Sequence, residues 1–130
     1  MICGMSIERG AEFAEFWTER HLCTLSTVRP NGTPHVVPVG VTLDLDAGVA
    51  RIITDGGSWK VKHVRQAGYA AVCQVDGRRW STVEGPAVVR EDPESVDEAV
   101  RRYALRYKQP RVNPTRVVIE IQVRRVTGTV

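Results

Sequence analysis

The sequence predicts a mainly β, α+β fold, a small antiparallel barrel of about six strands with flanking helices. Short runs rich in Val, Ile and Thr are separated by turn residues, and few helical segments lie between them. Gly85-Pro86 interrupts one run, as a bend in a curved sheet requires. The 130 residues are enough for one compact domain and too few for two, so we expect a single domain over residues 1–130.

The first part of the chain is expected to form one helix and three strands. Apolar residues recur at helical spacing over 6–21, with glutamates on the opposite side. The β-rich runs 22–28, 34–43 and 49–54 follow. Pro30-Asn31-Gly32 between the first two runs is typical of a turn, because Asn and Gly accept positive φ.

The second part is expected to alternate helices and strands. Ser58 can cap a short helix that Gly68 ends, and Asp92-Pro93 is a typical start for a longer helix. The predicted strands of this part cover 69–75, 79–89 and 115–126, and the last one alternates apolar and polar residues.

Composition excludes several classes of protein. Hydrophobic residues make up 42% and charged residues 25%, which is typical of a globular domain and not of a disordered chain. No run approaches the roughly 18 apolar residues of a membrane span, and the first residues do not resemble a secretory signal. Cys3, Cys23 and Cys73 are odd in number and widely spaced, so neither a disulfide framework nor a CxxC metal site is expected. We therefore expect a cytoplasmic protein with no membrane partner.

The net charge of +3 is too small to indicate nucleic acid as a partner. Basic residues nevertheless gather over 60–65, at 78–79 and over 101–116. This distribution favours a local anion site over a continuous basic stripe.

The segment from Gly56 to His63 is the strongest candidate site. A predicted strand runs through a glycine turn into a helix start, which leaves unpaired backbone N–H groups beside Lys60 and Lys62. Such a place suits a phosphate or a carboxylate. An ordinary glycine turn that caps a surface helix with solvated lysines explains the pattern equally well.

Other candidates have a structural alternative. Trp80 follows two arginines and can stack on a flat ring, but Trp at a strand start is more often a core or interface residue. His35 on a strand face is more often structural than catalytic. The basic run 101–108 is mostly a solvated helix face, although it could meet an anionic substrate.

Several catalytic patterns are missing from the sequence. There is no GxSxG and no HExxH, and His21, His35 and His63 are far apart. We therefore expect no metal site and no catalytic side chain, and any redox chemistry would come from a cofactor.

Four segments, taken in order, resemble the pyridoxamine 5′-phosphate oxidase-like split β-barrel superfamily: 21–27, 32–39, 57–60 and 75–85. Within it, the chain is similar to the branch that uses the deazaflavin coenzyme F420. The ending over 106–119 is most similar to the F420-dependent biliverdin reductases of mycobacteria.

The resemblance implies a homodimer of split barrels with coenzyme F420, an 8-hydroxy-5-deazaflavin, bound between the subunits. Ser58 and Lys60 would hold the coenzyme phosphate, with Lys62 and His63 close by. The residues implied around the ring are His35, Val37, Pro38 and Val39, with Thr54 and Trp80 near its edges.

The implied reaction is hydride transfer from the reduced deazaflavin to a conjugated acceptor, with biliverdin to bilirubin as the first choice. Candidates for the propionates of such a substrate are Arg78, Arg79, Arg106 and Arg111. Two alternatives remain at this point. One is an FMN-binding oxidase or reductase of the same fold, and the other is a carrier of a flavin or tetrapyrrole without enzymatic activity.

Overall fold

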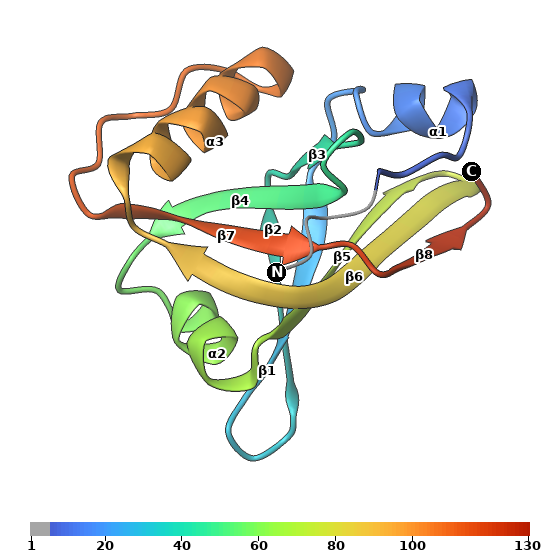
Figure 1. Cartoon of the computed structure of the whole chain (residues 1–130). Coiled ribbons are helices and arrows are strands. Elements are labelled where there is room, and N and C mark those ends of the chain that lie inside the picture. Colours follow the sequence, from blue (N-terminus) through green and yellow to red (C-terminus); the bar gives the residue numbers. More distant parts are fainter. Residues whose placement is uncertain (1–5) are drawn as a thin grey trace.

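A computed structural model describes residues 6–130, which fold into a curled antiparallel sheet with three helices around it (Figure 1). Eight strands form the sheet in the order β2-β1-β5-β6-β7-β4-β3, and β8 pairs with β6. The strands are β1 (Cys23–Val28), β2 (Pro34–Val39), β3 (Thr42–Asp44), β4 (Val49–Asp55), β5 (Tyr69–Asp76), β6 (Arg79–Arg90), β7 (Arg116–Gln122) and β8 (Arg125–Gly128). The helices are α1 (Ala11–Phe16), α2 (Trp59–Ala67) and α3 (Pro93–Arg106). The predicted fold class is confirmed, although the sheet is open between its edge strands β2 and β3.

The sheet has eight strands instead of the expected six because two predicted runs are interrupted. The run 34–43 breaks between β2 and β3, where side chains of the α3 region replace the ladder. The Val41 N–H donates to the Tyr107 hydroxyl at 3.1 Å, and the Val41 carbonyl accepts from Arg106 at 2.6 Å. The run 115–126 breaks at Val123, whose N–H donates to the Gly48 carbonyl at 2.9 Å.

The first helix is shorter than the expected 6–21, because only Ala11–Phe16 is helical. Gly10 has φ 96°, which ends any helix before it. After Phe16 the chain is held from outside: the Glu19 carbonyl accepts two bonds from Arg106, and the His21 carbonyl accepts one from Tyr107. These long-range bonds replace the continuation of the helix.

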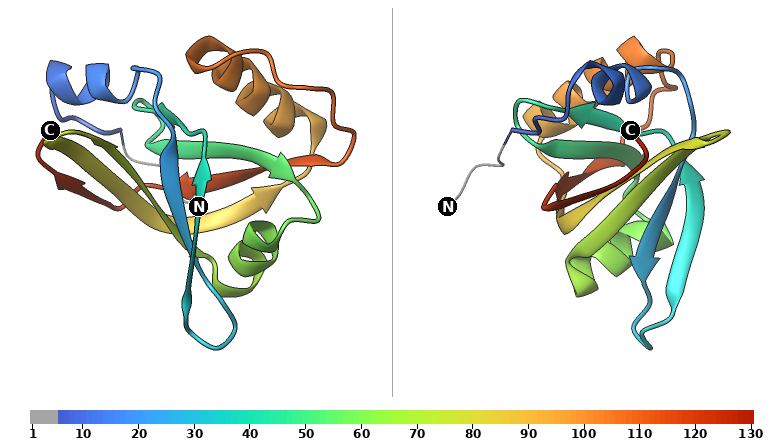
Figure 2. Two further views of the ribbon diagram at one scale, coloured as in Figure 1. Left: turned by 180° about the vertical axis from the view of Figure 1, so that it is seen from behind. Right: turned by 90° about the vertical axis from the view of Figure 1, so that its right-hand side faces the viewer.

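The predicted end of α2 at Gly68 and the predicted start of α3 at Asp92 are confirmed. Gly68 has φ 68° and ends α2, and its N–H donates to the Val64 carbonyl. The Asp92 side chain accepts from the Ser95 N–H at 2.9 Å and caps α3. In the two views of Figure 2, α1 and α3 lie toward one end of the sheet and α2 toward the other. No helix within residues 6–130 has the length and apolar character to cross a membrane.

Strand β6 joins the two halves of the sheet. Its first part pairs with β5 up to Pro86, and its last part pairs with β7 from Ala87 onward. The bend predicted at Gly85-Pro86 is confirmed by this exchange of partners. A Cβ on Gly85 would lie 1.8 Å from the Gln122 carbonyl oxygen, so this close crossing requires glycine.

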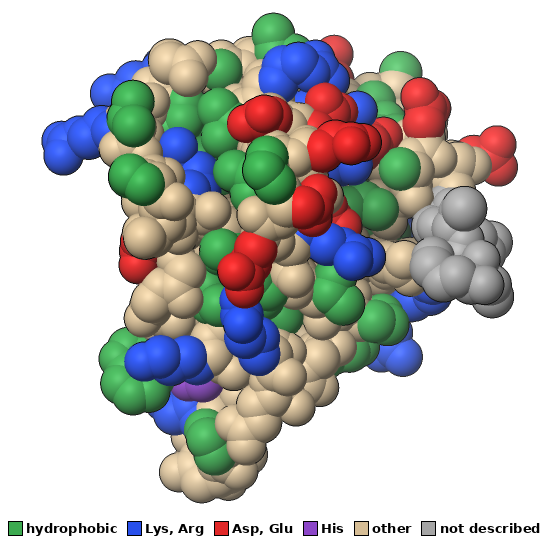
Figure 3. Space-filling model, turned by 60° about the vertical axis from the view of Figure 1, so that its left-hand side comes forward, with side chains coloured by type: hydrophobic (Ala, Val, Ile, Leu, Met, Phe, Trp, Pro, Cys, Tyr) green, Lys and Arg blue, Asp and Glu red, His purple; other side chains and the backbone are tan. Residues whose placement is uncertain are grey.

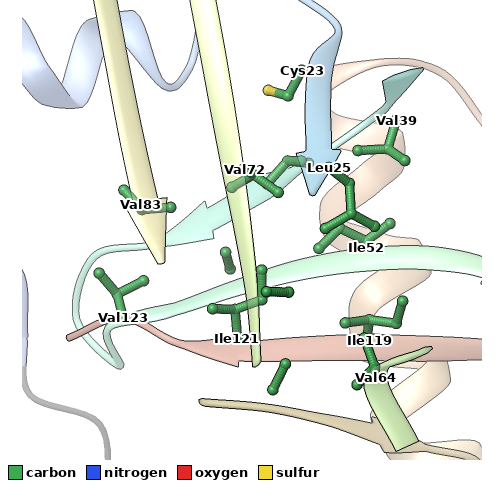
Figure 4. Close-up of a cluster of buried hydrophobic side chains, with 14 of the residues drawn as sticks. Cys23, Leu25, Val39, Ile52, Val64, Val72, Val83, Ile119, Ile121 and Val123 are labelled. Atoms are coloured by element: carbon green, nitrogen blue, oxygen red, sulfur yellow. The ribbon is translucent and has the colours of Figure 1, made fainter. Parts of the chain in front are cut away.

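The hydrophobic core lies inside the curl (Figure 4). Leu25 and Val72 enter it from one half of the sheet, and Ile52 and Ile119 enter it from the other. Val64 adds the inner side of α2. Because this core covers the inner side of α2, the start of that helix is held beside the ends of β2 and β4.

Candidate functional site

A groove of about 270 Å³ lies where β2, β4, α2 and the segment after α3 meet. It is called the Lys60 groove here, and it is lined by Pro38, Val39, Gly40, Ile53, Thr54, Lys60, Tyr103, Pro110, Asn113 and Arg116. Pro38, Val39, Thr54 and Lys60 were predicted site residues, and the fold brings them together. They come from separate strands and a helix, so one wall is apolar and the other carries a cation.

The cationic end of the groove has unsatisfied donors. Among residues 6–130, the Lys60 ammonium forms no hydrogen bond or ion pair, and burial lowers its pKa, partly offset by Asp55 nearby. The N–H groups of Trp59 and Val61, like that of Lys60, have no acceptor within the described chain. The free N–H groups and a partly desolvated ammonium therefore belong to the same first turn of α2, which favours an anion beside it.

Ser58 stands at the start of α2, but its side chain does not cap the helix as predicted. Its hydroxyl oxygen lies 3.3 Å from the Thr54 hydroxyl oxygen instead. Two hydroxyls therefore stand beside the free N–H groups of the first helical turn, where they can add hydrogen bonds to a bound phosphate.

The glycine turn itself does not supply the expected free donors. The Gly56 N–H donates to the Thr115 carbonyl at 2.9 Å, and the Gly57 N–H donates to the Asp55 carboxylate at 2.9 Å. The Ser58 N–H donates to the Asp55 carbonyl at 3.2 Å. The prediction of unpaired amides was therefore wrong for the turn, because Asp55 and the loop before β7 satisfy them.

Asp55 also holds the loop between α3 and β7, which borders the groove, in place through hydrogen bonds. Its carboxylate accepts from the Thr115 hydroxyl and from the Asn113 side-chain amide, and these bonds with the Gly57 N–H lower its pKa. The loop after α3 is thereby held against the end of β4. This tie explains why Asn113 and Pro110, which no local pattern singles out, line the Lys60 groove.

The groove continues into a basic arm. A second hollow of about 660 Å³ shares Tyr103, Pro110, Asn113 and Arg116 with the Lys60 groove. It adds Lys108, Gln109, Arg111 and Val112. The predicted substrate residue Arg111 therefore lies along the same continuous depression as Lys60, and its guanidinium has no partner among residues 6–130.

Tyr103 marks the junction of the groove and the arm, and sequence reasoning assigned it only to the apolar face of α3. A Cβ on Gly40 would lie 2.8 Å from the Tyr103 ring, and the Tyr107 ring packs against Tyr103 at 4.8 Å between centroids. The ring is therefore held in position. No local sequence signal identifies this contact, because it depends on the break between β2 and β3.

Comparison with known proteins decides the family. The family model described as pyridoxamine 5′-phosphate oxidase matches residues 10–129. The chain belongs to this family. It is also 50% identical over 114 residues to an F420H(2)-dependent biliverdin reductase of Mycobacterium tuberculosis (strain CDC 1551 / Oshkosh), which covers 88% of this chain and 83% of the relative.

Solved structures agree on the fold of this pyridoxamine 5′-phosphate oxidase family member. A conserved hypothetical protein of Mycobacterium tuberculosis, Rv2991, superimposes with a TM-score of 0.80 and 24% identity, over 95% of this chain and 85% of that one. A structure named F420 reductase gives a TM-score of 0.73 and 22% identity, over 93% of this chain and 98% of that one.

Predicted cofactor residues of this family member that lie outside the Lys60 groove include His35, His63, Lys62 and Val37. His35 and His63 line a separate pocket with Arg29, on the other side of α2. The Lys62 ammonium lies 4.3 Å from the centre of the Trp59 ring. The predicted Val37 is half-buried against the core, since it faces the inner side of β2.

The remaining predicted residues are those of the β5–β6 turn and Arg106. Arg78, Arg79 and Trp80 lie at the β5–β6 turn, at the opposite end of the molecule from α2 in Figure 1. Arg79 forms ion pairs there with Glu19 and Asp76. Within one protomer, these three residues therefore lie away from the Lys60 groove.

The Arg106 side chain forms its hydrogen bonds with groups of the fold. Its guanidinium donates to the carbonyls of Glu19 and Val41 and to the Gln74 side chain, and it lies 5.7 Å from the centre of the Trp17 ring. These acceptors explain its position without any substrate.

A cluster at the β5–β6 end resembles a metal site by spacing alone. Glu19, His21 and Asp76 hold ligand atoms within 4.8 Å of one another. The Arg79 guanidinium bonds both carboxylates, and its bonds lower the pKa of Glu19. The negative charge of the cluster is therefore already matched by a cation inside the chain.

Proposed function

We propose that this protein is an F420-dependent reductase that transfers a hydride from the reduced deazaflavin to biliverdin, giving bilirubin. The observation that carries the proposal is the Lys60 groove, which is lined by an unpaired ammonium from the free first turn of α2 and by Pro38 and Val39 from β2. The relative that is 50% identical over most of the chain is named for this coenzyme and this substrate.

The residues of the groove fit a phosphorylated, flat cofactor. Lys60, the Ser58 hydroxyl and the free N–H groups of the first turn of α2 would hold the phosphate. Pro38 and Val39 offer an apolar wall for a ring. When bound, the reduced deazaflavin supplies the hydride, and the protein supplies position and exclusion of water.

The basic arm fits the acceptor. A linear tetrapyrrole carries propionate groups, and Arg111 has no partner in the described chain with which they would compete. Tyr103 lines both the arm and the Lys60 groove, at the junction between them. This chain therefore offers separate places for the two acidic parts of a ternary complex.

The coenzyme experiment measures binding and turnover anaerobically. Reduced F420 with biliverdin should be reoxidised at the rate at which bilirubin appears. FMN is the comparison cofactor, because it tests the FMN-dependent alternative. Submicromolar FMN binding without F420 binding would contradict the choice of coenzyme, and F420 binding without turnover of any acceptor would favour the carrier alternative.

We also propose that the protein is a homodimer whose partner completes the site. The outer face of the β2-β1-β5-β6 part exposes Val36, Val28, Val75 and Trp80, with Val75 and Trp80 directly paired across β5 and β6. Exposed apolar side chains gathered on one sheet face are typical of an interface. A two-fold arrangement would let the β5–β6 turn of one protomer approach the Lys60 groove of the other.

Light scattering and sedimentation test the dimer. Val36→Asp and Val75→Asp each place a charge on this face and should yield monomers with unchanged secondary structure. Val112→Asp is the matched control, since Val112 is 94% exposed in the loop after α3. A monomeric wild type at micromolar concentration would contradict the proposal.

A cytoplasmic location is the remaining part of the proposal. Cys23 and Cys73 carry free thiols, and burial raises the pKa of Cys23 to about 11. Unpaired thiols are typical of a reducing compartment. Cys3 belongs to residues 1–5, outside the described part of the chain.

A further inference from the structure

Tyr103 and Tyr107 lie four residues apart at the end of α3, and their hydroxyl groups have different surroundings. The Tyr107 hydroxyl accepts from the Val41 N–H at 3.1 Å and donates to the His21 carbonyl at 2.6 Å. The Tyr103 hydroxyl has no hydrogen-bond partner among residues 6–130, and its oxygen is not enclosed by the protein. Tyr103 therefore carries an accessible hydroxyl proton that the fold does not use.

The position of the Tyr103 ring is fixed by its neighbours. The Tyr107 ring packs against it with 4.8 Å between the centroids. A Cβ on Gly40 would lie 2.8 Å from the Tyr103 ring and 3.2 Å from the Tyr107 ring. Gly40 does not have a positive φ, so it is the space for the two rings that requires glycine here. The free hydroxyl is therefore carried on a ring whose position the fold determines.

The charged groups around Tyr103 are cations. Those that line the Lys60 groove or the basic arm with it are Lys60, Lys108, Arg111 and Arg116. No Asp or Glu of residues 6–130 lines either hollow, and the Asp55 carboxylate beside Lys60 is bonded to Thr115 and Asn113. Figure 3 shows the side of the molecule that carries the segment between α3 and β7, and blue Lys and Arg side chains gather at its upper left beside hydrophobic ones. Positive charge stabilises the phenolate that remains when a tyrosine gives up its proton.

The proposed reduction of biliverdin, on which this inference rests, needs a proton as well as a hydride. The hydride brings two electrons and one hydrogen to a carbon of the conjugated acceptor, and a nitrogen of the acceptor must take a proton to complete bilirubin. We expect the coenzyme and the acceptor to meet where the Lys60 groove joins the basic arm. The described residues that line both hollows are Tyr103, Pro110, Asn113 and Arg116. Of these four, Tyr103 has a proton that it can transfer, since a guanidinium keeps its proton in proteins and the other two side chains do not titrate.

We propose that Tyr103 is the proton donor of this reduction. Its O–H bond breaks as an N–H bond forms on the acceptor, while the two electrons come from the reduced deazaflavin, which is oxidised. The phenolate then takes a proton from solvent through the open basic arm. Tyr107 and Gly40 are positioning residues, because they hold the ring that carries the hydroxyl.

Tyr103→Phe tests the role, since it keeps the ring and removes the hydroxyl. At saturating reduced F420, kcat for biliverdin should fall about a hundredfold or more, the usual contribution of a positioned acid. The affinity for F420 and the melting temperature should stay unchanged. The wild-type kcat should also decline at alkaline pH, because a donor must hold its proton, and Tyr103→Phe should lack this decline.

Tyr69→Phe is the matched control. Tyr69 lies on β5, where its hydroxyl donates to Glu84 at 2.9 Å, and it lines neither hollow. Its loss should change neither kcat nor the pH profile. Equal kcat values for Tyr103→Phe and the wild type would overturn the proposal. So would a raised KM with an unchanged kcat, because the hydroxyl would then bind the acceptor without giving it a proton.

Tyrosine NMR adds a measurement that needs no turnover. The chain has three tyrosines, so labelling of the ring carbon that bears the hydroxyl gives three signals, which Tyr69→Phe and Tyr103→Phe assign. Biliverdin added with oxidised F420 should shift the Tyr103 signal and leave the Tyr69 signal in place. A Tyr103 signal that does not respond would overturn the proposal.

The two proposals fail in different ways. A wild type that does not oxidise reduced F420 in the presence of biliverdin contradicts the proposed reductase function, and the role of Tyr103 fails with it. Turnover that persists at the wild-type rate in Tyr103→Phe contradicts the role of Tyr103 alone.

Discussion

The cations of Arg106 and Lys60 have opposite surroundings. Arg106 donates to carbonyls of Glu19 and Val41 and to the Gln74 side chain, and it ties α3 to the segments before β1 and β3. Lys60 has no bonding partner among residues 6–130, and burial lowers its pKa. Both are basic residues in stretches predicted to meet an anion. This difference shows that a charged group whose hydrogen bonds are satisfied stabilises the fold, whereas a charged group without partners is available to bind a ligand.

The largest expected effect in this comparison is on stability. Arg106→Ala should lower the free energy of unfolding by about 3 kcal/mol or more, because several enclosed acceptors lose their donor. Urea denaturation measures it. The control is Arg101→Ala, which breaks an exposed pair with Glu98 and should change the same quantity by less than about 1 kcal/mol. An unchanged stability with lost biliverdin turnover would instead make Arg106 a substrate residue.

The next effect is on coenzyme binding. Lys60→Ala should weaken binding of F420 by about 1–3 kcal/mol, since it removes a charge-assisted contact with the phosphate. The free energy of unfolding should stay equal or rise, because the ammonium has no partner in the described chain to lose. Calorimetry and denaturation give the two values.

The neighbouring Lys62→Ala is the matched control for Lys60→Ala. Its ammonium lies over the Trp59 ring, outside the groove, so the change in F420 affinity should be below about 1 kcal/mol. Equal losses in both variants would place the phosphate elsewhere.

A pH series sharpens the contrast between the two cations. The Lys60 pKa is lowered by burial, so in the free protein the ammonium loses its proton at a lower pH than an exposed lysine does. F420 affinity should therefore fall as the pH rises through this pKa. Between the folded and unfolded pKa values the unfolded chain binds more protons, so the stability contributed at this residue rises with pH.

Lys60→Arg keeps its charge over the same range and should bind F420 with an affinity that changes less as the pH rises toward 10.5. Affinity measured by fluorescence quenching decides the point. Identical pH profiles for the wild type and Lys60→Arg would show that Lys60 does not titrate in binding.

The smallest expected effect concerns the basic arm. Arg111→Ala should raise the KM for biliverdin by about three- to tenfold with kcat little changed, because an exposed arginine contributes a screened attraction. The effect should shrink at high salt. Arg101→Ala, on a part of α3 outside the arm, should leave KM unchanged. A fall in kcat alone would argue against a substrate-binding role for Arg111.

The parts of the fold with local signals were predictable. Gly68 and Asp92 determine their helix ends through their own backbone and side chain, and Gly85 marks the bend of β6. The length of the first helix was not predictable, because Arg106 and Tyr107 capture the carbonyls that follow it from more than 80 residues away. No periodicity in 6–21 carries that information.

The candidate site likewise contains residues with a local sequence signal and residues without one. Lys60 and Ser58 could be selected from the sequence, because a glycine turn before a helix is a local pattern, and their role stays a prediction. Tyr103 and Asn113 were missed, since they reach the groove only after the chain folds back. The assignment of His63 to the coenzyme stays a prediction, and its side chain lines the pocket with Arg29 and His35 instead of the Lys60 groove.

The bend at Gly85 has a consequence for ligand entry. One wall of the Lys60 groove comes from β2 and the other from β4, and these strands belong to the two halves that meet only along β6 and the shared core. No ladder joins the edge strands β2 and β3 within residues 6–130, so the spacing of the two walls of the groove depends on how β6 bends and not on a strand pairing between them. The crossing of two backbones far from the ligand thereby sets the width of the entrance.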